Sequence, residues 1–101
     1  MPKLYEYLGI IIYFYTNEHE PIHVHGRHAG RESRAEIIIE DGRVARVEIS
    51  QVAGKRPLEG GKLKDFAIFV ETRADEIVER WINFFVYNIR TKPEIITRRI
   101  K

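Results

Sequence analysis

The chain of 101 residues contains no cysteine, which excludes a disulfide framework and any thiolate metal site. Without cysteines, the reducing cytoplasm is the expected compartment. Long hydrophobic runs are also missing, because the apolar segment 8–14 is far too short to cross a bilayer. The first seven residues lack the basic start and long apolar stretch of a signal peptide. The sequence therefore predicts a cytoplasmic protein without membrane association.

A strong excess of charge of one sign is absent too. The chain has 17 Lys and Arg against 15 Asp and Glu, and its formal net charge of +2 neither demands nor excludes a nucleic-acid partner. A hydrophobic fraction of 44% and a charged fraction of 32% are ordinary for a globular protein. This length supports one modest core, so we expect a single domain over residues 1–101.

Two strands are predicted in the first third of the chain. Residues 8–15 are continuously apolar, with many β-branched and aromatic side chains, which is typical of a central strand buried on both faces. Residues 22–27 alternate instead. Ile22 and Val24 point to one side of this second strand, and the opposite side carries His23, His25 and Arg27.

Residues 35–40 and 43–49 predict a hairpin around Asp41-Gly42. A two-residue turn would mix polar and apolar residues on each face. We therefore favour a three-residue loop over residues 40–42 followed by a bulge, which would place Glu36 opposite Arg46. One face of this hairpin would then be apolar, with Ala35, Ile37, Ile39, Ala45, Val47 and Ile49.

Helical spacing follows a loop at residues 50–61. Leu63, Phe66 and Val70 mark a first apolar stripe, and a capping signal at residues 72–75 opens a second segment that contains Trp81. One kinked helix and two separate helices remain alternatives. Residues 94–101 would form a short edge strand or a frayed basic tail after Pro93. The predicted fold is α+β, with an antiparallel sheet of about four strands covered on one face by the C-terminal helical segment.

Histidine is missing everywhere except in residues 19–28, where all four histidines of the chain occur. His23 and His25 would share a strand face with their Cα atoms about 7 Å apart, close enough to bind one metal ion. His19, in the preceding turn, would add a third nitrogen, with Glu18 or Glu20 as a further ligand or an orienting group. The candidate metal ligands are therefore His19, His23 and His25, a set that suits a divalent transition metal.

Two other interpretations of these histidines stay open. They would be structural if they pack, donate to backbone carbonyls, or stack on Tyr13 and Tyr15. A metal-free catalytic role would need His23 or His25 to face a substrate. His28 is odd-spaced from His25 and would reach the same face only through a bulge.

Positive charge gathers directly after the histidines. Arg27, Arg31 and Arg34, next to aromatic residues, are candidate nucleic-acid contacts. The alternative is a solvated rim offset by nearby glutamates. On the second helical segment, Ile82 and Val86 widen the apolar surface next to Trp81, which favours a contact with a second copy or another protein.

The run from Leu8 to His25 resembles the hallmark of a family of small bacterial proteins catalogued as a domain of unknown function, number 4160. That hallmark is an apolar strand followed by Phe/Tyr-Tyr-x-Asn-Asp/Glu-His-x-Pro-x-His-x-His. A tryptophan late in the helical region, here Trp81, also fits the family outline. The chain departs from many members in its loop 51–61 and in its basic extension after Pro93. The signature residues of the motif correspond to Asn17, Glu18, His19, Pro21, His23 and His25.

The resemblance implies a partner, because members are often encoded beside another small protein in an arrangement that resembles toxin–antitoxin pairs. We therefore expect a protein-interaction component of a two-protein module of this kind. The alternative is a metal-dependent or histidine-based hydrolase or nuclease that uses His19, His23 and His25. Whether the protein is an enzyme is left open by the sequence.

Overall fold

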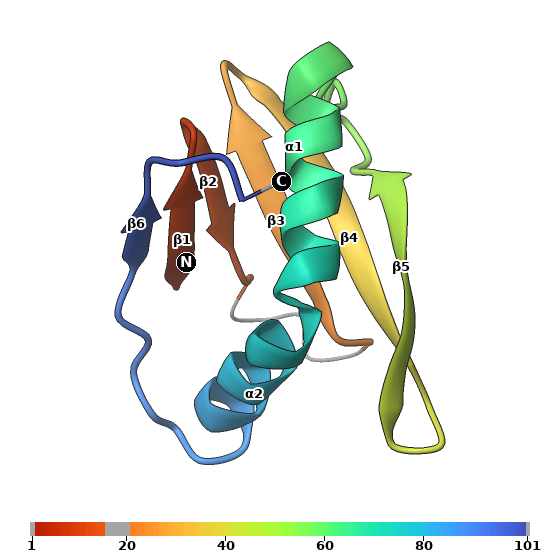
Figure 1. Ribbon diagram of the computed structural model, residues 1–101, viewed down its shortest axis with the longest axis vertical. Helices are drawn as coiled ribbons and strands as arrows, with labels where there is room; N and C mark the ends of the chain where they lie inside the picture. The colour runs from red at the N-terminus through yellow and green to blue at the C-terminus, as the bar shows by residue number, and fades with distance from the viewer. Residues whose placement is uncertain (1, 16–20, 101) are drawn as a thin grey trace.

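The computed structural model of the protein describes residues 2–15 and 21–100, which form one mixed sheet with two helices on one side (Figure 1). The sheet has six strands in the order β5-β4-β3-β2-β1-β6. Neighbours from β1 to β5 are antiparallel, whereas β6 lies parallel to β1. The strands are β1 Lys3–Tyr7, β2 Ile10–Tyr13, β3 His23–His28, β4 Arg31–Glu40, β5 Arg43–Gln51 and β6 Glu94–Ile96.

The α+β class and the position of the helices on one face are confirmed. The prediction of about four antiparallel strands is wrong, because the sheet has six strands and is mixed. The apolar run 8–15 is not one strand: Leu8 and Gly9, both with positive φ, form a turn that pairs β2 back onto β1. The short edge strand that was one alternative after Pro93 exists as β6, which pairs in parallel with β1 across more than eighty residues of chain, a pairing that no local pattern indicates.

The β4–β5 hairpin closes with a two-residue turn rather than the predicted three-residue loop. Asp41 and Gly42 have φ values of 53° and 76°, as a type I′ turn requires, and Glu40 pairs with Arg43. A register shift after this turn leaves Ala45 as an extra residue on β5. Beyond the bulge, Ala35 faces Ile49 and Ile37 faces Val47, so the apolar face exists as expected. On the other face Glu36 lies opposite Glu48, not Arg46.

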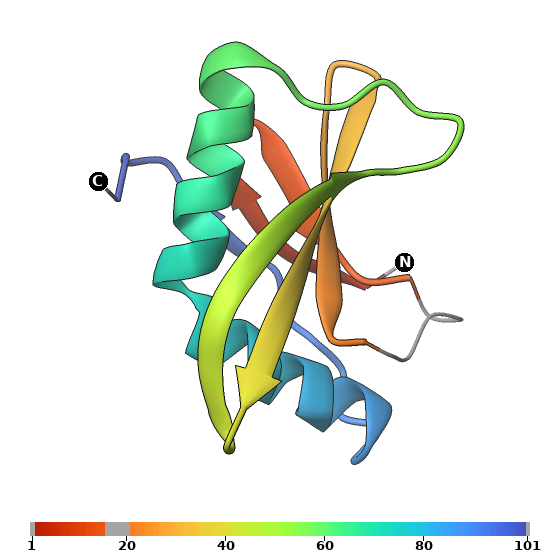
Figure 2. The ribbon, with the colours of Figure 1, turned by 90° about the vertical axis from the view of Figure 1, so that its right-hand side faces the viewer.

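The helical region forms two helices, α1 Gly60–Thr72 and α2 Ala74–Phe85, separated only by Arg73. Both pack into one core against the same sheet face; in Figure 2, α1 stands beside that face and α2 runs from it across the lower end of the strands. Phe66 of α1 packs against Gly26 of β3, where an added Cβ atom would lie 2.5 Å from the ring. Neither helix in the described part of the chain is long and apolar enough to span a membrane.

The hydrophobic core lies between this sheet face and the two helices. It includes Tyr5 and Tyr7 of β1, which contact the ring of Phe69 on α1. Trp81 is buried and Ile82 packs against the core, so only Val86 remains of the apolar flank that was predicted as a partner surface. The basic C-terminal segment is docked rather than frayed, since Arg99 forms an ion pair with the buried Asp65 of α1.

Candidate functional site

The side of the sheet opposite the helices, here called the open face, carries the polar side chains that the sequence singled out. In Figure 2, α1 lies on one side of the sheet, and the loop after β5 bulges toward the other. Strand pairing aligns Tyr13 of β2, His25 of β3 and Arg34 of β4 in one row across this face. The neighbouring rows pair His23 with Glu36 and Arg27 with Glu32. We call Tyr13, Tyr15, His23, His25 and Glu32 the open-face cluster.

A buried carboxylate organises this cluster. Glu32 Oε2 accepts a hydrogen bond from the Tyr15 hydroxyl at 3.0 Å and lies 3.1 Å from His25 Nδ1. His25 and Glu32 are each only 2% exposed. A carboxylate against Nδ1 fixes the orientation of the imidazole ring and stabilises positive charge on it. Glu32 was not among the predicted site residues, because its place beside His25 depends on the β3–β4 register.

Aromatic rings enclose His25. The Tyr13 ring stacks on it with centroids 5.6 Å apart, and the Tyr15 ring meets it edge-on at 4.3 Å. Burial and hydrogen bonds with Tyr15 and Glu32 raise the pKa of Tyr13 well above its ordinary value. Tyr13 therefore stays a neutral phenol at physiological pH and can donate a hydrogen bond.

His23 lies beside His25, with ring centroids 5.2 Å apart. Its Nδ1 donates to the carbonyl oxygen of Pro21 at 2.6 Å. The contacts expected of structural histidines are thus present: stacking on tyrosines and a bond to a backbone carbonyl. The predicted adjacency of His23 and His25 on one strand face is confirmed.

Two of the three predicted metal ligands, His23 and His25, lie within the described residues. His19, Asn17 and Glu18 lie outside the described residues. Within residues 2–15 and 21–100, no three His, Cys, Asp or Glu side chains gather closely enough to hold a metal ion. The three-histidine metal site therefore stays a prediction, to which the structure contributes the neighbouring pair His23 and His25.

The three arginines of the candidate nucleic-acid site do not share one surface. Arg27 lies on the open face with its guanidinium 5.4 Å from the centre of the Tyr13 ring. Arg34 lies on the same face beside His25. Arg31 pairs with His28 and, by strand alternation, points to the helix side, where it contacts Glu59 at 3.3 Å. A nucleic-acid contact would therefore use Arg27 and Arg34 without Arg31.

A cavity of about 560 Å³ opens next to the cluster. The loop after β5 forms one side of it, and the open face forms the other. The Nε atom of Arg34 is buried and has no hydrogen-bond partner among the described residues, while its Nη2 lies 4.0 Å from Glu36. The lining residues are Tyr15, His25, Arg34, Gln51, Val52, Ala53 and Lys55. Residues 51–55 were predicted only as a loop, because nothing in their sequence shows onto which face they fold.

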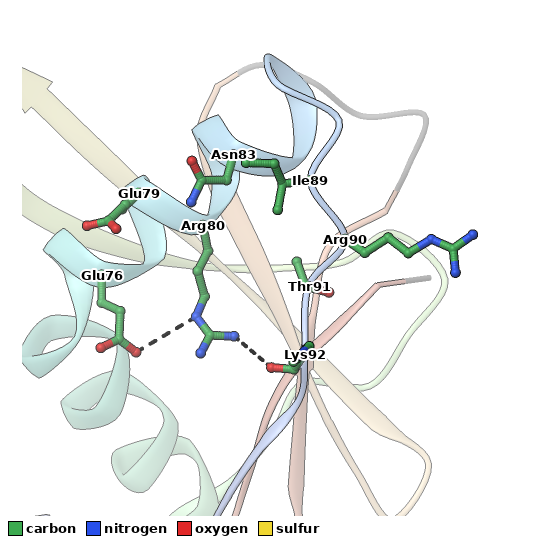
Figure 3. A pocket seen from close by; sticks show the side chains of 8 residues that line it. All are labelled: Glu76, Glu79, Arg80, Asn83, Ile89, Arg90, Thr91 and Lys92. Carbon is green, nitrogen blue, oxygen red and sulfur yellow. Dashed lines mark hydrogen bonds and ion pairs between the residues drawn. The ribbon is translucent and has the colours of Figure 1, made fainter.

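A second hollow, of about 390 Å³, lies between α2 and residues 89–92 (Figure 3). Arg80 crosses it and donates to the carbonyl oxygens of Leu4 and Lys92, at 3.4 and 3.0 Å. Its guanidinium also lies over the Tyr5 ring at 4.8 Å. Because Arg80 is engaged in tying the C-terminal segment to the sheet, this hollow is a structural joint, and the open-face cavity is the better candidate site.

The family model for the domain of unknown function 4160 matches residues 9–82, from the start of β2 into α2. The chain belongs to this family. The match includes the whole histidine-rich segment, so the resemblance found in the sequence motif is confirmed. β1, β6 and the C-terminal segment lie outside the matched range of the 4160 domain. No curated protein and no solved structure gives a significant match.

Proposed function

We propose that this member of the 4160 family is the interaction component of a two-protein module resembling toxin–antitoxin pairs, and that it holds its partner through the open-face cavity. The observation that carries this proposal is the charge of the cavity. Arg34 and Lys55 line it from two different elements, and a buried Nε donor of Arg34 lacks a partner within the described residues. A buried donor left unpaired costs free energy, so a ligand that accepts from it is favoured.

The chemistry of these donors selects an anionic group on the partner. Guanidinium groups bind carboxylates through paired, charge-assisted hydrogen bonds, and Lys55 adds a second positive charge. We infer that an Asp or Glu side chain, or a C-terminal carboxylate, of a partner protein enters the cavity. The Tyr13 and Tyr15 rings packed on His25 would hold this wall of the cavity in one conformation before the partner binds. Such preorganisation lowers the entropic cost of binding.

Exposed apolar side chains support a protein partner over a free small anion. Val86, Tyr87 and Ile89, in the segment after α2, are 58%, 65% and 53% exposed. Apolar groups in one short exposed segment are a common feature of protein-binding surfaces. This segment lies outside the range matched by the family model, so it would contribute to the choice of partner by this particular chain.

The test is co-expression of the protein with the products of the genes adjacent to its own. We expect one of them to co-purify with the wild type, and Arg34→Ala combined with Lys55→Ala to weaken this complex at least about tenfold, as the loss of charge-assisted hydrogen bonds implies. Lys64→Ala is the matched control, because Lys64 is exposed on α1, away from the open face. Equal retention of the partner by the double variant and the control would remove the cavity from the interface.

A second candidate function is histidine-based hydrolysis, including nuclease activity. The specific observation in its favour is the hydrogen bond between His25 and the buried Glu32, since a carboxylate-oriented imidazole is a common general acid–base arrangement. In this proposal His25 exchanges a proton with the substrate, and Arg34 binds its phosphate. A metal-dependent form would use His19, His23 and His25 as ligands.

The two functions predict different responses of the same residues. Hydrolysis requires that His25→Asn abolish turnover of an activated phosphodiester, whereas a binding module shows no turnover in any variant.

Elemental analysis of protein purified without an affinity tag tests the metal-dependent form. Less than about a tenth of an equivalent of any transition metal would contradict a tight site.

A further inference from the structure

Strand β5 presents a long unpaired edge. It runs over nine residues, Arg43–Gln51, and lies at the border of the sheet, where β4 is its one partner among the described residues (Figure 1). The opposite border, β6, has only three residues. Seven of the nine residues of β5 are exposed. A long exposed edge offers unpaired backbone groups to another strand, and proteins usually protect such an edge.

The charges on β5 do not provide that protection. Charged side chains guard an edge when they would meet like charges on a second copy. β5 instead carries Arg46 and Glu48 on either side of Val47, with side chains 54% and 52% exposed. In an antiparallel pair of two β5 strands centred on Val47, Arg46 of each copy would lie opposite Glu48 of the other. Centring the pair on residue 46 or 48 would place like charges opposite each other, so the charges select one register.

The neighbouring strand strengthens this selection. Glu48 lies directly opposite Glu36 of β4, which is an unfavourable cross-strand pair. Within the chain Glu48 accepts from Arg46 Nε at 2.8 Å, and Arg46 is shared with Glu40 at 3.3 Å. An arginine from a second copy on the outer side of Glu48 would offset the repulsion from Glu36.

The helix-side surface of β5 favours the same occupant. Ile39 and Ile49 lie on the apolar side of the hairpin but are 40% and 37% exposed, because the helices do not fully cover this end of the sheet. The register centred on Val47 would place the Val47 side chains of the two copies beside each other on this helix-side face. Apolar side chains would therefore meet on one face while the two Arg–Glu pairs form on the other.

We propose that the protein forms a homodimer through antiparallel pairing of β5 with β5 of a second copy, centred on Val47. The two-fold axis is perpendicular to the sheet, so both six-stranded sheets join into one and both open faces point the same way. The two cavities then lie on a common surface. The bulge at Ala45 keeps the regular part of the pairing short, so the dimer is in reversible equilibrium with the monomer.

Sedimentation analysis of charge variants tests this proposal. Arg46→Glu alone and Glu48→Arg alone each place like charges opposite each other at two symmetric positions. Each is expected to raise the dimer dissociation constant about tenfold or more. The double variant R46E/E48R restores the pairing and is expected to dimerise as the wild type does.

Mixing the two single variants gives the decisive result. A copy with Arg46→Glu has two acidic positions, and a copy with Glu48→Arg has two basic ones, so their equimolar mixture is expected to form a heterodimer of wild-type affinity. An effect on folding alone would not be repaired by mixing; circular dichroism of each variant checks folding separately. A wild type that stays monomeric at its highest soluble concentration would overturn the proposal. Single variants that dimerise like the wild type, or a mixture that stays monomeric, would also overturn it.

Discussion

The two faces of the sheet bury side chains equally deeply but by different means. On the helix side, Phe66 and Phe69 are fully buried among apolar neighbours. On the open face, Tyr13, His25 and Glu32 are 1%, 2% and 2% exposed without any helix above them. The two phenylalanines are held by apolar packing. The open-face side chains are held largely by hydrogen bonds to the carboxylate of Glu32. The exposed fraction of a side chain therefore does not distinguish the hydrophobic core from the candidate site in this protein. The kind of contact that the side chain makes does distinguish them.

The largest expected effect is on the helix side. Phe66→Ala removes a fully buried ring between α1 and β3 and should lower the free energy of unfolding by about 3–5 kcal/mol. Denaturant unfolding measures this loss. If the two faces are independent, the folded fraction of the variant still binds whatever the open-face cavity binds. Loss of that binding in folded protein would show that the faces are coupled through β3.

A smaller effect is expected from adding volume at the same contact. Gly26→Ala would place a methyl group 2.5 Å from the Phe66 ring and should cost about 1–3 kcal/mol of stability. The matched control is the same substitution in a Phe66→Leu background, where the smaller side chain leaves room. We expect the two changes to be less costly together than their sum. If the losses of unfolding free energy of the two single variants simply add, the Phe66 ring moves aside easily, and close packing of α1 does not require a glycine at position 26.

The sequence predicted local features better than distant pairings. His23 and His25 share a face because strand alternation acts between residues two apart, so their adjacency could be read directly from the chain. The Leu8–Gly9 turn was missed because a leucine with positive φ is rare, and the apolar run continues through it. Glu32 and the loop at residues 51–55 enter the site through strand register and loop folding, which depend on tertiary contacts. The pairing of β6 with β1 joins segments nearly ninety residues apart in the chain, so no local pattern could give its partner or its parallel direction.

On the open face, the deciding contact is the carboxylate of Glu32. Glu32→Ala takes away the acceptor shared by Tyr15 and His25 and should cost about 1–3 kcal/mol of stability. Glu32→Gln keeps an acceptor of similar shape and should cost less. Thermal unfolding compares the two variants, and the Nδ1–H resonance of His25 reports whether the ring keeps its orientation. Equal stability of wild type and Glu32→Ala would mean that this face is held by packing, as the helix side is.

The smallest effects concern two tyrosines, one on each face. Burial, together with a hydrogen bond to Glu76, raises the pKa of Tyr5 above its ordinary value of 10.0, and burial and hydrogen bonds with Tyr15 and Glu32 do the same for Tyr13. A group with a raised folded-state pKa contributes stability that is complete below its unfolded pKa and is lost as pH rises toward the folded pKa. Stability should therefore fall above pH 10, by at most about 1.4 kcal/mol per pH unit for each tyrosine.

Tyr5→Phe and Tyr13→Phe should each reduce the loss of unfolding free energy per pH unit above pH 10 by the contribution of one tyrosine. The comparison is made after subtracting the stability that each variant loses at neutral pH. Unfolding at a series of alkaline pH values measures the slopes, and the absorbance of tyrosinate in the native protein follows ionisation directly. Equal slopes for the two variants would show that the open face excludes hydroxide as well as the helix-covered core does. A Tyr13 that ionises near pH 10 while Tyr5 does not would show that the open face admits solvent, as a surface that receives a ligand must.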